Sequence, residues 1–398
     1  DDDIFKFGSE YIEREMKITN VETFVVDADW RNWFFVQVET DTGITGVGEA
    51  LGAEGLTTAL EEVSKSHQHY LIGEDPLNRK TINRRLTRYP FAWRAGKLIN
   101  AVAAAFDIAL WDIAGKHYGE PVWKLLGGKV HDEIPVYANG WHIGDRTPEN
   151  YAHHAKEAVE EQGYPALKCD PFAHYEHSLT DSQIDEVAAL LEAVRDAVGW
   201  DVGIALDCHG RFTRRGAIEV ADALEEYDIL FLEEPVELED REVMAEVTKQ
   251  VDMPVATGER IYNNETMADV IRKQACDIIQ PDVTNYGSLQ EAQHAAAMAK
   301  NRYMTIAPHN PNAGVSTAAS LHLCAGLDNL EVLEHMSRDV PWGDDVIETS
   351  WEVSDGTIVV PDEPGLGVEF DPEAARNHPG EPKEQNSLFD EEGALKRP

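Results

Sequence analysis

Eight short apolar runs, each ending in polar residues, constrain the fold of this chain more than any other feature. Amphipathic, helix-like stretches separate the runs along the sequence. Buried parallel strands have this texture, and in barrels their carboxyl ends carry function while helices wrap the outside. The pattern predicts an α/β fold with a (β/α) barrel. The runs are IPVYANG, ALKCD, VGIALDCHG, ILFLEEP, PVATGE, DIIQPD, MTIAPHN and LEVLEH.

The chain on either side of these runs does not alternate regularly between strand-like and helix-like stretches. From about residue 17, ITNVETFVVD and NWFFVQVETDTGITGVGEA indicate strands joined by a DTG turn, followed by helical stretches. After the barrel, GTIVVPDEPGLGVEFD indicates short strands, and a tail rich in Pro, Glu and Asn follows. A chain of 398 residues is too long for one small core. We predict an N-terminal α+β capping domain over 1–133, a barrel over 134–345, and a C-terminal segment over 346–398 that rejoins the capping domain.

The chain is strongly acidic, with 74 Asp and Glu against 34 Lys and Arg and a formal charge of -40. The sequence contains no basic stripe that would neutralise phosphates, so we expect no nucleic-acid partner. Because the acidic excess spreads through helix-like stretches, it indicates a solvated, salt-adapted (halophilic) surface. The charge says little about the substrate.

Cysteine spacing and hydropathy favour a cytoplasmic protein. The four cysteines are far apart in sequence and form no CxxC pair, so we expect reduced, buried thiols. We expect no membrane partner, because we expect no apolar stretch of the roughly 18 residues that are needed to span a bilayer. The N-terminus DDDIFKFGSEYIERE lacks the basic start and apolar core of a signal peptide.

Six of the polar residues that follow the apolar runs recur at nearly constant spacing. The intervals between them are 26, 26, 23, 27 and 25 residues. One strand and helix of a barrel together take about 30 residues. Consecutive strands therefore each offer one such group at the same rim. The six are Asp207, Glu233, Glu259, Asp282, His309 and Glu334.

The first three of these residues predict a magnesium site. Carboxylates that converge from neighbouring strands repel one another unless a cation lies between them, and oxygen ligands select a hard ion. Open coordination positions would receive a substrate carboxylate and stabilise the enediolate formed when the adjacent carbon loses its proton. Each acid alone would more often be a helix N-cap or part of a surface ion pair. The common spacing of Asp207, Glu233 and Glu259 favours the metal site.

Asp282 and His309 follow neighbouring strands and form a predicted catalytic pair. A carboxylate that is hydrogen-bonded to an imidazole fixes its tautomer and raises its basicity, which suits a general base. A single histidine in this position would more often be a core residue with its hydrogen bonds satisfied. The acid one unit upstream favours the base and its orienting carboxylate.

Two further sets of residues lie beside the predicted metal site. His209 comes two residues after Asp207, so it points to the same side and is placed to protonate a leaving hydroxyl; a purely supporting role beside Asp207 remains open. Lys168 and Asp170, in KCD, share a face at the end of the second strand. Lys168 is either a ligand for the substrate carboxylate or the partner of Asp170 in a structural ion pair.

The ordered motifs LDCHGR, FLEEP, TGER, IIQPD, APHNP and LEVLEH resemble those of the mandelate racemase subgroup of the enolase superfamily. Within that subgroup the chain most resembles the galactonate-dehydratase-like sugar-acid dehydratases, over nearly its whole length. The resemblance implies a modified TIM barrel capped by an α+β domain. It also implies homo-oligomers with an even number of subunits.

The same resemblance implies a role for each matching residue. Asp207, Glu233 and Glu259 would bind Mg²⁺, and His309 with Asp282 would form the base dyad. Glu334 would face the substrate carboxylate opposite the metal, and His209 would be the general acid. Loops of the capping domain usually select the substrate in this family. Candidate contacts here are Trp30, Arg31, Trp93 and Arg94, for which plain packing is an equal alternative.

One departure from the family pattern bears on the reaction. Racemases of this subgroup usually carry KxK at the second strand, whereas Asp170 stands here in place of the second lysine. Inversion needs an acid and a base on opposite faces of the intermediate, while dehydration needs one base and one leaving-group acid. The family's dyad removes protons from R-configured centres. This preference suits galactonate, gluconate and xylonate without choosing among them.

The prediction is therefore a magnesium-dependent aldonate dehydratase. Such a lyase removes the C2 proton and eliminates the C3 hydroxyl to give a 2-keto-3-deoxy acid. A racemase or epimerase is the main alternative. A cycloisomerase or dipeptide epimerase would favour lysine bases on both sides of the barrel. A non-catalytic metal-binding barrel would lack a ligand or a base, and the sequence has both.

Overall fold

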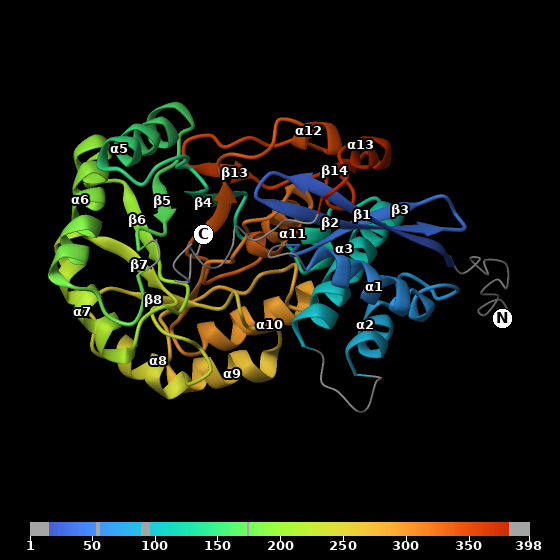
Figure 1. The fold of residues 1–398 in the computed structure, drawn as a ribbon. Coiled ribbons are helices and arrows are strands. Elements are labelled where there is room, and N and C mark those ends of the chain that lie inside the picture. Colours follow the sequence, from blue (N-terminus) through green and yellow to red (C-terminus); the bar gives the residue numbers. More distant parts are fainter. Residues whose placement is uncertain (1–15, 53–55, 89–95, 173–174, 382–398) are drawn as a thin grey trace, which may run out of the picture.

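The computed structural model describes residues 16–52, 56–88, 96–172 and 175–381, which form a capping domain beside a barrel (Figure 1). The capping domain holds an antiparallel sheet in the order β1-β2-β3. Its strands are β1 (Ile18–Ala28), β2 (Arg31–Thr40) and β3 (Thr45–Ala50), and its helices are α1 (Thr57–His67), the 3-10 turn η1 (Gln68–Tyr70), α2 (Arg79–Arg88), α3 (Lys97–Tyr118) and α4 (Val122–Leu125).

Two glycines let β3 pack directly against α3. A Cβ atom built on Gly48 would lie 1.8 Å from the carbonyl oxygen of Ala105, and one on Gly46 would lie 2.2 Å from that of Ala109. Only a residue without a side chain permits such a close approach between a strand and a helix. The GVGEA motif therefore fixes β3, and Glu49 within it, against the core of the domain.

Helix α3 corrects our reading of hydropathy. Its 22 residues are long and apolar enough to cross a bilayer by length and composition, although we expected no such stretch. The folded chain buries 89% of its most apolar window inside the protein. Core helices that are surrounded by protein have this composition. The apolar character of α3 is accounted for by its contacts with β3, α1 and α2.

The barrel contains eight parallel strands in the order β10-β9-β8-β7-β6-β5-β4-β11, as predicted. A bridge between Ile306 and Leu330 connects its two ends. The strands are β4 (Glu133–Asn139), β5 (Ala166–Cys169), β6 (Gly203–Asp207), β7 (Ile229–Glu233), β8 (Val255–Thr257), β9 (Ile278–Ile279), β10 (Thr305–Ile306) and β11 (Leu333–Met336). The outer helices are α5 (Pro148–Lys156) with the π-helical turn η2 (Glu157–Glu161), α6 (Asp181–Val198), α7 (Arg214–Leu224) with the 3-10 turn η3 (Glu225–Tyr227), α8 (Arg241–Thr248), α9 (Asn264–Lys273), α10 (Leu289–Lys300) and α11 (Gly314–Ala325).

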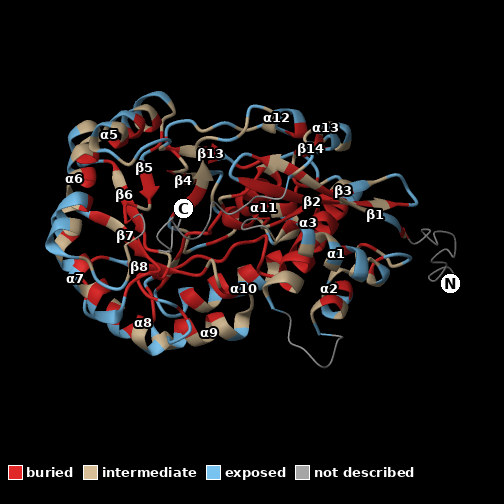
Figure 2. Ribbon diagram, viewed as in Figure 1, coloured by how far each residue is buried: buried red, intermediate tan, exposed pale blue. Residues whose placement is uncertain are grey.

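A layer of apolar side chains fills the barrel interior, with one residue from each strand or its immediate flank. Figure 2 shows the strands buried and the outer faces of the helices exposed. When large and small side chains from the strands fill the interior, such a barrel is a packed core rather than a pore. Polar groups are therefore displaced to the strand ends. The layer consists of Tyr137, Ala166, Ala205, Phe231, Ala256, Ile278, Ala307 and Val332.

The C-terminal segment contacts both parts of the molecule. Its strand β13 (Thr357–Val359) pairs antiparallel with β4 of the barrel, while β12 (Ile347–Thr349) pairs with β14 (Val368–Phe370). The Phe370 ring lies 5.0 Å from that of Phe24 in β1, measured between centroids. Two short helices, α12 (Gly343–Val346) and α13 (Pro372–Asn377), complete the segment. The division at residues 133 and 345 stays a prediction.

Candidate active site

Three carboxylates from consecutive strands meet at the carboxyl end of the barrel. Asp207 ends β6, Glu233 ends β7, and Glu259 follows β8 by two residues. One oxygen from each of the three lies within 4.8 Å of the others. The structure therefore brings together the three residues that the even spacing singled out.

This cluster has the chemistry of a divalent-cation site. Glu233 is fully buried, and its Oε1 atom has no hydrogen-bond partner among the described residues. Burial, with the nearby charge of Asp207, raises the pKa of Glu233 to about 7. A buried carboxylate oxygen without a donor is costly unless a cation or water satisfies it. An oxygen-only donor set suits a hard divalent ion.

Lys168 lies beneath the cluster and partly neutralises it. Its Nζ atom is 2.8 Å from Glu233, 3.0 Å from Glu334 and 3.7 Å from Asp207. Burial alone would lower the pKa of Lys168, but the charges of Glu233 and Glu334 raise it well above the ordinary value. The expected alternative of an ion pair with Asp170 is not formed in the described structure. Strand β5 ends at Cys169, so the two side chains no longer share a strand face.

His309 and Asp282 form the close pair expected of a base and its orienting acid. The Nδ1 atom of His309 lies 2.8 Å from Oδ2 of Asp282, and Nε2 lies 2.9 Å from Oε2 of Glu259. Both residues are buried. Burial opposes protonation of the imidazole, yet the charges of Glu259 and Glu334 raise the pKa of His309 well above its ordinary value.

Glu334 completes the ring of polar groups. Its Oε1 atom accepts a hydrogen bond from Asn139 at 2.6 Å, and its Oε2 atom accepts one from the backbone N–H of Asn310 at 2.8 Å. Burial would raise the pKa of Glu334, but Lys168 and His309 lower it overall. Glu334 is therefore held as a carboxylate beside His309, with 4.0 Å between Nε2 and Oε2.

His209 lies beside Asp207, whereas His309 lies beside Glu259. Its backbone has a left-handed conformation, with φ of 49°, which turns the chain after Asp207. Its Nε2 atom is 3.3 Å from Asp207, and its Nδ1 atom is 3.1 Å from Asp170. Burial lowers the pKa of His209, but Asp207 and Asp170 raise it to about 9. Asp207 and Asp170 therefore both favour the protonated form of the His209 imidazole.

Our sequence analysis missed the residue that holds Asp170. The Arg211 guanidinium donates two parallel hydrogen bonds to Asp170, at 2.7 and 2.6 Å. Such bidentate pairs are geometrically specific. Asp170 thus orients His209 as Asp282 orients His309. The only signal in the sequence was the arginine at the end of LDCHGR.

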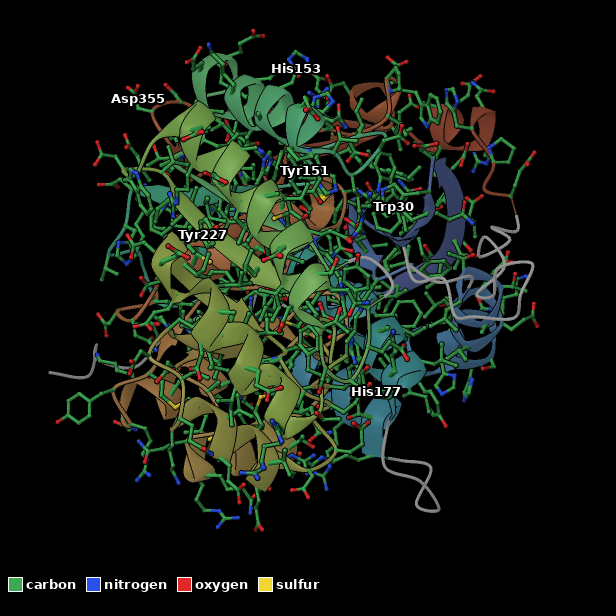
Figure 3. The ribbon with its side chains drawn as sticks, turned by 60° about the vertical axis from the view of Figure 1, so that its left-hand side comes forward. Trp30, Tyr151, His153, His177, Tyr227 and Asp355 are labelled. Carbon is green, nitrogen blue, oxygen red and sulfur yellow. The ribbon has the colours of Figure 1, made fainter. Side chains whose placement is uncertain are left out.

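The structure describes two of the four capping-domain residues that we predicted to contact the substrate. Trp30 lies in the turn between β1 and β2 (Figure 3), and 59% of its surface is exposed. The neighbouring Arg31 is buried and lies 3.5 Å from Asp339, which follows β11. This turn therefore reaches the loop beyond the strand that carries Glu334. Trp93 and Arg94 lie outside the described residues.

Two family models match this chain. The N-terminal domain model of mandelate racemase and muconate lactonizing enzyme matches residues 15–127, and the enolase C-terminal domain-like model matches residues 150–375. The D-xylonate dehydratase of Haloferax volcanii is 34% identical over 95% of this chain and 92% of its own length.

A second relative and a solved structure extend the comparison. The D-gluconate/D-galactonate dehydratase of Picrophilus torridus is 30% identical over 84% of this chain and 85% of its own. A solved crystal structure, that of a mandelate racemase/muconate lactonizing enzyme from Sulfitobacter sp., is of a protein with 34% sequence identity to this chain. It superposes with a TM-score of 0.86 over 92% of this chain and 96% of its own.

Proposed function

Because this chain belongs to the mandelate racemase and muconate lactonizing enzyme family of the enolase superfamily, we propose that it is a magnesium-dependent sugar-acid dehydratase. Its substrate would be an aldonate, with D-galactonate, D-gluconate and D-xylonate as candidates. The observation that carries the proposal is the pair of His–Asp couples that border the carboxylate cluster, His209 with Asp170 beside Asp207 and His309 with Asp282 beside Glu259. One couple supplies a base and the other an acid.

The base is His309. Its Nδ1–H donates to Asp282, which leaves Nε2 to receive the proton from C2 of the substrate. The tautomer follows from that hydrogen bond, since an aspartate can only accept. Asp282 is itself held by the backbone N–H of Thr284 at 2.8 Å and by Asn312 at 3.2 Å. The imidazole is therefore fixed in direction before the substrate binds.

The acid is His209. Its hydrogen bond to Asp170 favours the protonated imidazole, so it can deliver a proton to the C3 hydroxyl as the carbon–oxygen bond breaks and water leaves. The resulting enol becomes the 2-keto-3-deoxy acid. Asp170 and Arg211 hold the imidazole on the side of Asp207. The two proton transfers then involve different imidazoles, one beside Asp207 and one beside Glu259.

Asp207, Glu233 and Glu259 would hold the metal. When bound, a divalent cation would stabilise the charge that develops on the substrate carboxylate and would offset the carboxylates that keep His309 protonated. Lys168 and Glu334 would border the space for that carboxylate. Magnesium is the proposed ion because the donor set is all oxygen.

The test is a panel of aldonates incubated with the purified protein and Mg²⁺, at high and low salt. A 2-keto acid formed from at least one member supports the proposal. No keto acid from any member refutes it. His309→Asn serves as the matched control, because it keeps the shape of the site but cannot accept the proton.

The second imidazole favours one alternative, an epimerase in which His209 returns a proton to the opposite face of the intermediate. The same incubations in deuterated water separate the two reactions. An epimerase would release inverted, C2-deuterated acid and no keto acid. A dehydratase would release keto acid.

Two predictions about the whole protein stay open to direct tests. We propose a homo-oligomer with an even number of subunits, which light scattering of the purified protein measures. We also propose a cytoplasmic location, which fractionation of source cells measures.

A further inference from the structure

The capping domain supplies the N-terminal cap of a barrel helix. Glu49 lies on β3 and is 1% exposed. Its Oε1 atom accepts a hydrogen bond from the backbone N–H of Ala313, and its Oε2 atom accepts one from Ser316, both at 2.8 Å. The N-cap residue of α11 is Ala313, which has no side-chain acceptor. The carboxyl group of Glu49 therefore replaces the missing cap across the domain boundary.

The first turn of α11 connects this cap to Asp282. Asn312, directly before Ala313, donates from Nδ2 to Oδ2 of Asp282 at 3.2 Å. The same Nδ2 atom lies 3.4 Å from Oγ of Ser316, whose backbone N–H is bound by Glu49. All of these residues are buried. A chain of hydrogen bonds thus runs from β3 through α11 to the acid that orients His309.

A second branch of the same network reaches Glu334. The hydroxyl of Ser316 donates to Oδ1 of Asn310 at 2.7 Å. The backbone N–H of Asn310 donates to Glu334 at 2.8 Å. Ser316, in the first turn of α11, is therefore linked to Asp282 through Asn312 and to Glu334 through Asn310. Glu49 accepts the backbone hydrogen bond of this same serine. Figure 1 shows α11 on the side of the barrel that faces the capping sheet.

A similar interaction elsewhere lacks this connection. Asp107, on α3, accepts a hydrogen bond from the backbone N–H of Leu289 at 3.0 Å, at the start of α10. Ser288 already caps α10 through its own side chain. Among the described hydrogen bonds, no side chain of the first turn of α10 reaches Asp282 or His309. Asp107 thus gives a matched comparison: a buried interdomain carboxylate at a helix N-terminus with no route to the dyad.

We propose that Glu49 is a positioning residue for the base dyad, acting through α11 and Asn312 on Asp282. The inference rests on the proposed function, in which His309 removes the C2 proton. Docking of the capping domain then links its sheet to the catalytic pair. It fixes the direction of the base.

The kinetic test compares Glu49→Gln with Asp107→Asn, each loaded with Mg²⁺ and assayed on D-galactonate, D-gluconate and D-xylonate. Glutamine keeps the size of the side chain but presents an NH₂ group to one of the two N–H donors. For Glu49→Gln we expect kcat to fall about 10- to 100-fold with KM unchanged, as when a residue that orients a catalytic group is removed. Asp107→Asn should keep wild-type kcat. Equal losses of kcat in the two variants, or full kcat in Glu49→Gln, would overturn the inference.

A second measurement does not depend on any substrate. Crystal structures of the wild type and Glu49→Gln should show that the hydrogen bond from Asn312 to Asp282 is broken in the variant and intact in the wild type. A hydrogen bond that stays at 3.2 Å in the variant would overturn the inference even if kcat falls. If the wild type dehydrates no aldonate while this hydrogen bond breaks in the variant, the proposed function fails and the positioning role stands.

A third variant guards against misfolding of Glu49→Gln. Asn312→Ala leaves the Glu49 cap on α11 in place and removes the link to Asp282, together with the contacts of Nδ2 to Thr284 and Ser316. We expect the same loss of kcat as for Glu49→Gln. Wild-type kcat in Asn312→Ala would overturn the inference.

Discussion

Replacing Lys168 with methionine should destabilise the protein strongly and make its stability depend on a divalent ion. Methionine keeps the length of the buried side chain but removes the one lysine charge beneath the carboxylate cluster. Glu233 and Glu334 lie 2.8 and 3.0 Å from Nζ. The variant therefore leaves these buried carboxylates without their cation.

The magnitude follows from these distances. At an effective dielectric constant of about 20, unit charges about 3 Å apart attract by roughly 5 to 6 kcal/mol. Most of this attraction offsets the cost of taking the ammonium group out of water. Removing one partner of a buried ion pair therefore costs about 3–5 kcal/mol. We expect the free energy of unfolding to fall by that amount when no metal is present.

Urea unfolding with EDTA and with Mg²⁺ measures the effect. Mg²⁺ should stabilise Lys168→Met more than the wild type, because the cluster no longer contains a competing cation. The control is Lys65→Met, which removes a half-exposed lysine 3.1 and 3.2 Å from Glu61 and Glu62 and should change nothing measurable. An equal urea midpoint for Lys168→Met and wild type in EDTA would refute the reasoning.

Three further predictions concern the two His–Asp couples and the interdomain cap. His209→Asn should lower keto-acid formation about 10²- to 10⁴-fold yet retain exchange of the C2 proton in deuterated water, whereas His309→Asn should lose both, as NMR of the substrate would show. Asp170→Ala should lower the free energy of unfolding in urea by about 3–5 kcal/mol, since it leaves the buried Arg211 guanidinium without its partner. Burial raises the pKa of Glu49 from 4.5 to about 8, so the folded protein keeps a proton that the unfolded chain releases between these pH values. Stability should therefore fall as pH rises through that window, by up to about 1.4 kcal/mol per pH unit, and urea unfolding of Glu49→Gln should lack this slope.

The polar strand ends were predictable because a barrel repeats. Each strand and helix takes a similar number of residues, so groups spaced evenly in sequence return to the same rim. This regularity brought Asp207, Glu233 and Glu259 together, and it placed His309 beside Asp282.

The partners of Lys168 and Asp170 were not predictable in the same way. Strand periodicity put both side chains on one face, but β5 ends between them. Lys168 then turns to Glu233, while Asp170 pairs with Arg211. Which acid a buried cation meets depends on where a strand stops, and a sequence locates strand ends poorly.

The apolar composition of α3 is a second case in which the sequence did not predict the surroundings of a residue or helix. Its apolar length is a property of sequence, but only the packing of the folded chain tells a core helix from a membrane span.

The sequence by itself predicted the eight barrel strands, the acids at their ends and the proximity of His309 to Asp282, because these depend on local period and on one repeat length. Only the tertiary structure decided that Glu49, more than 260 residues away from Ala313 and Ser316 in the chain, caps α11 and is linked to Asp282. Interactions between domains depend on how two separately formed surfaces dock. No periodicity along the chain encodes that docking.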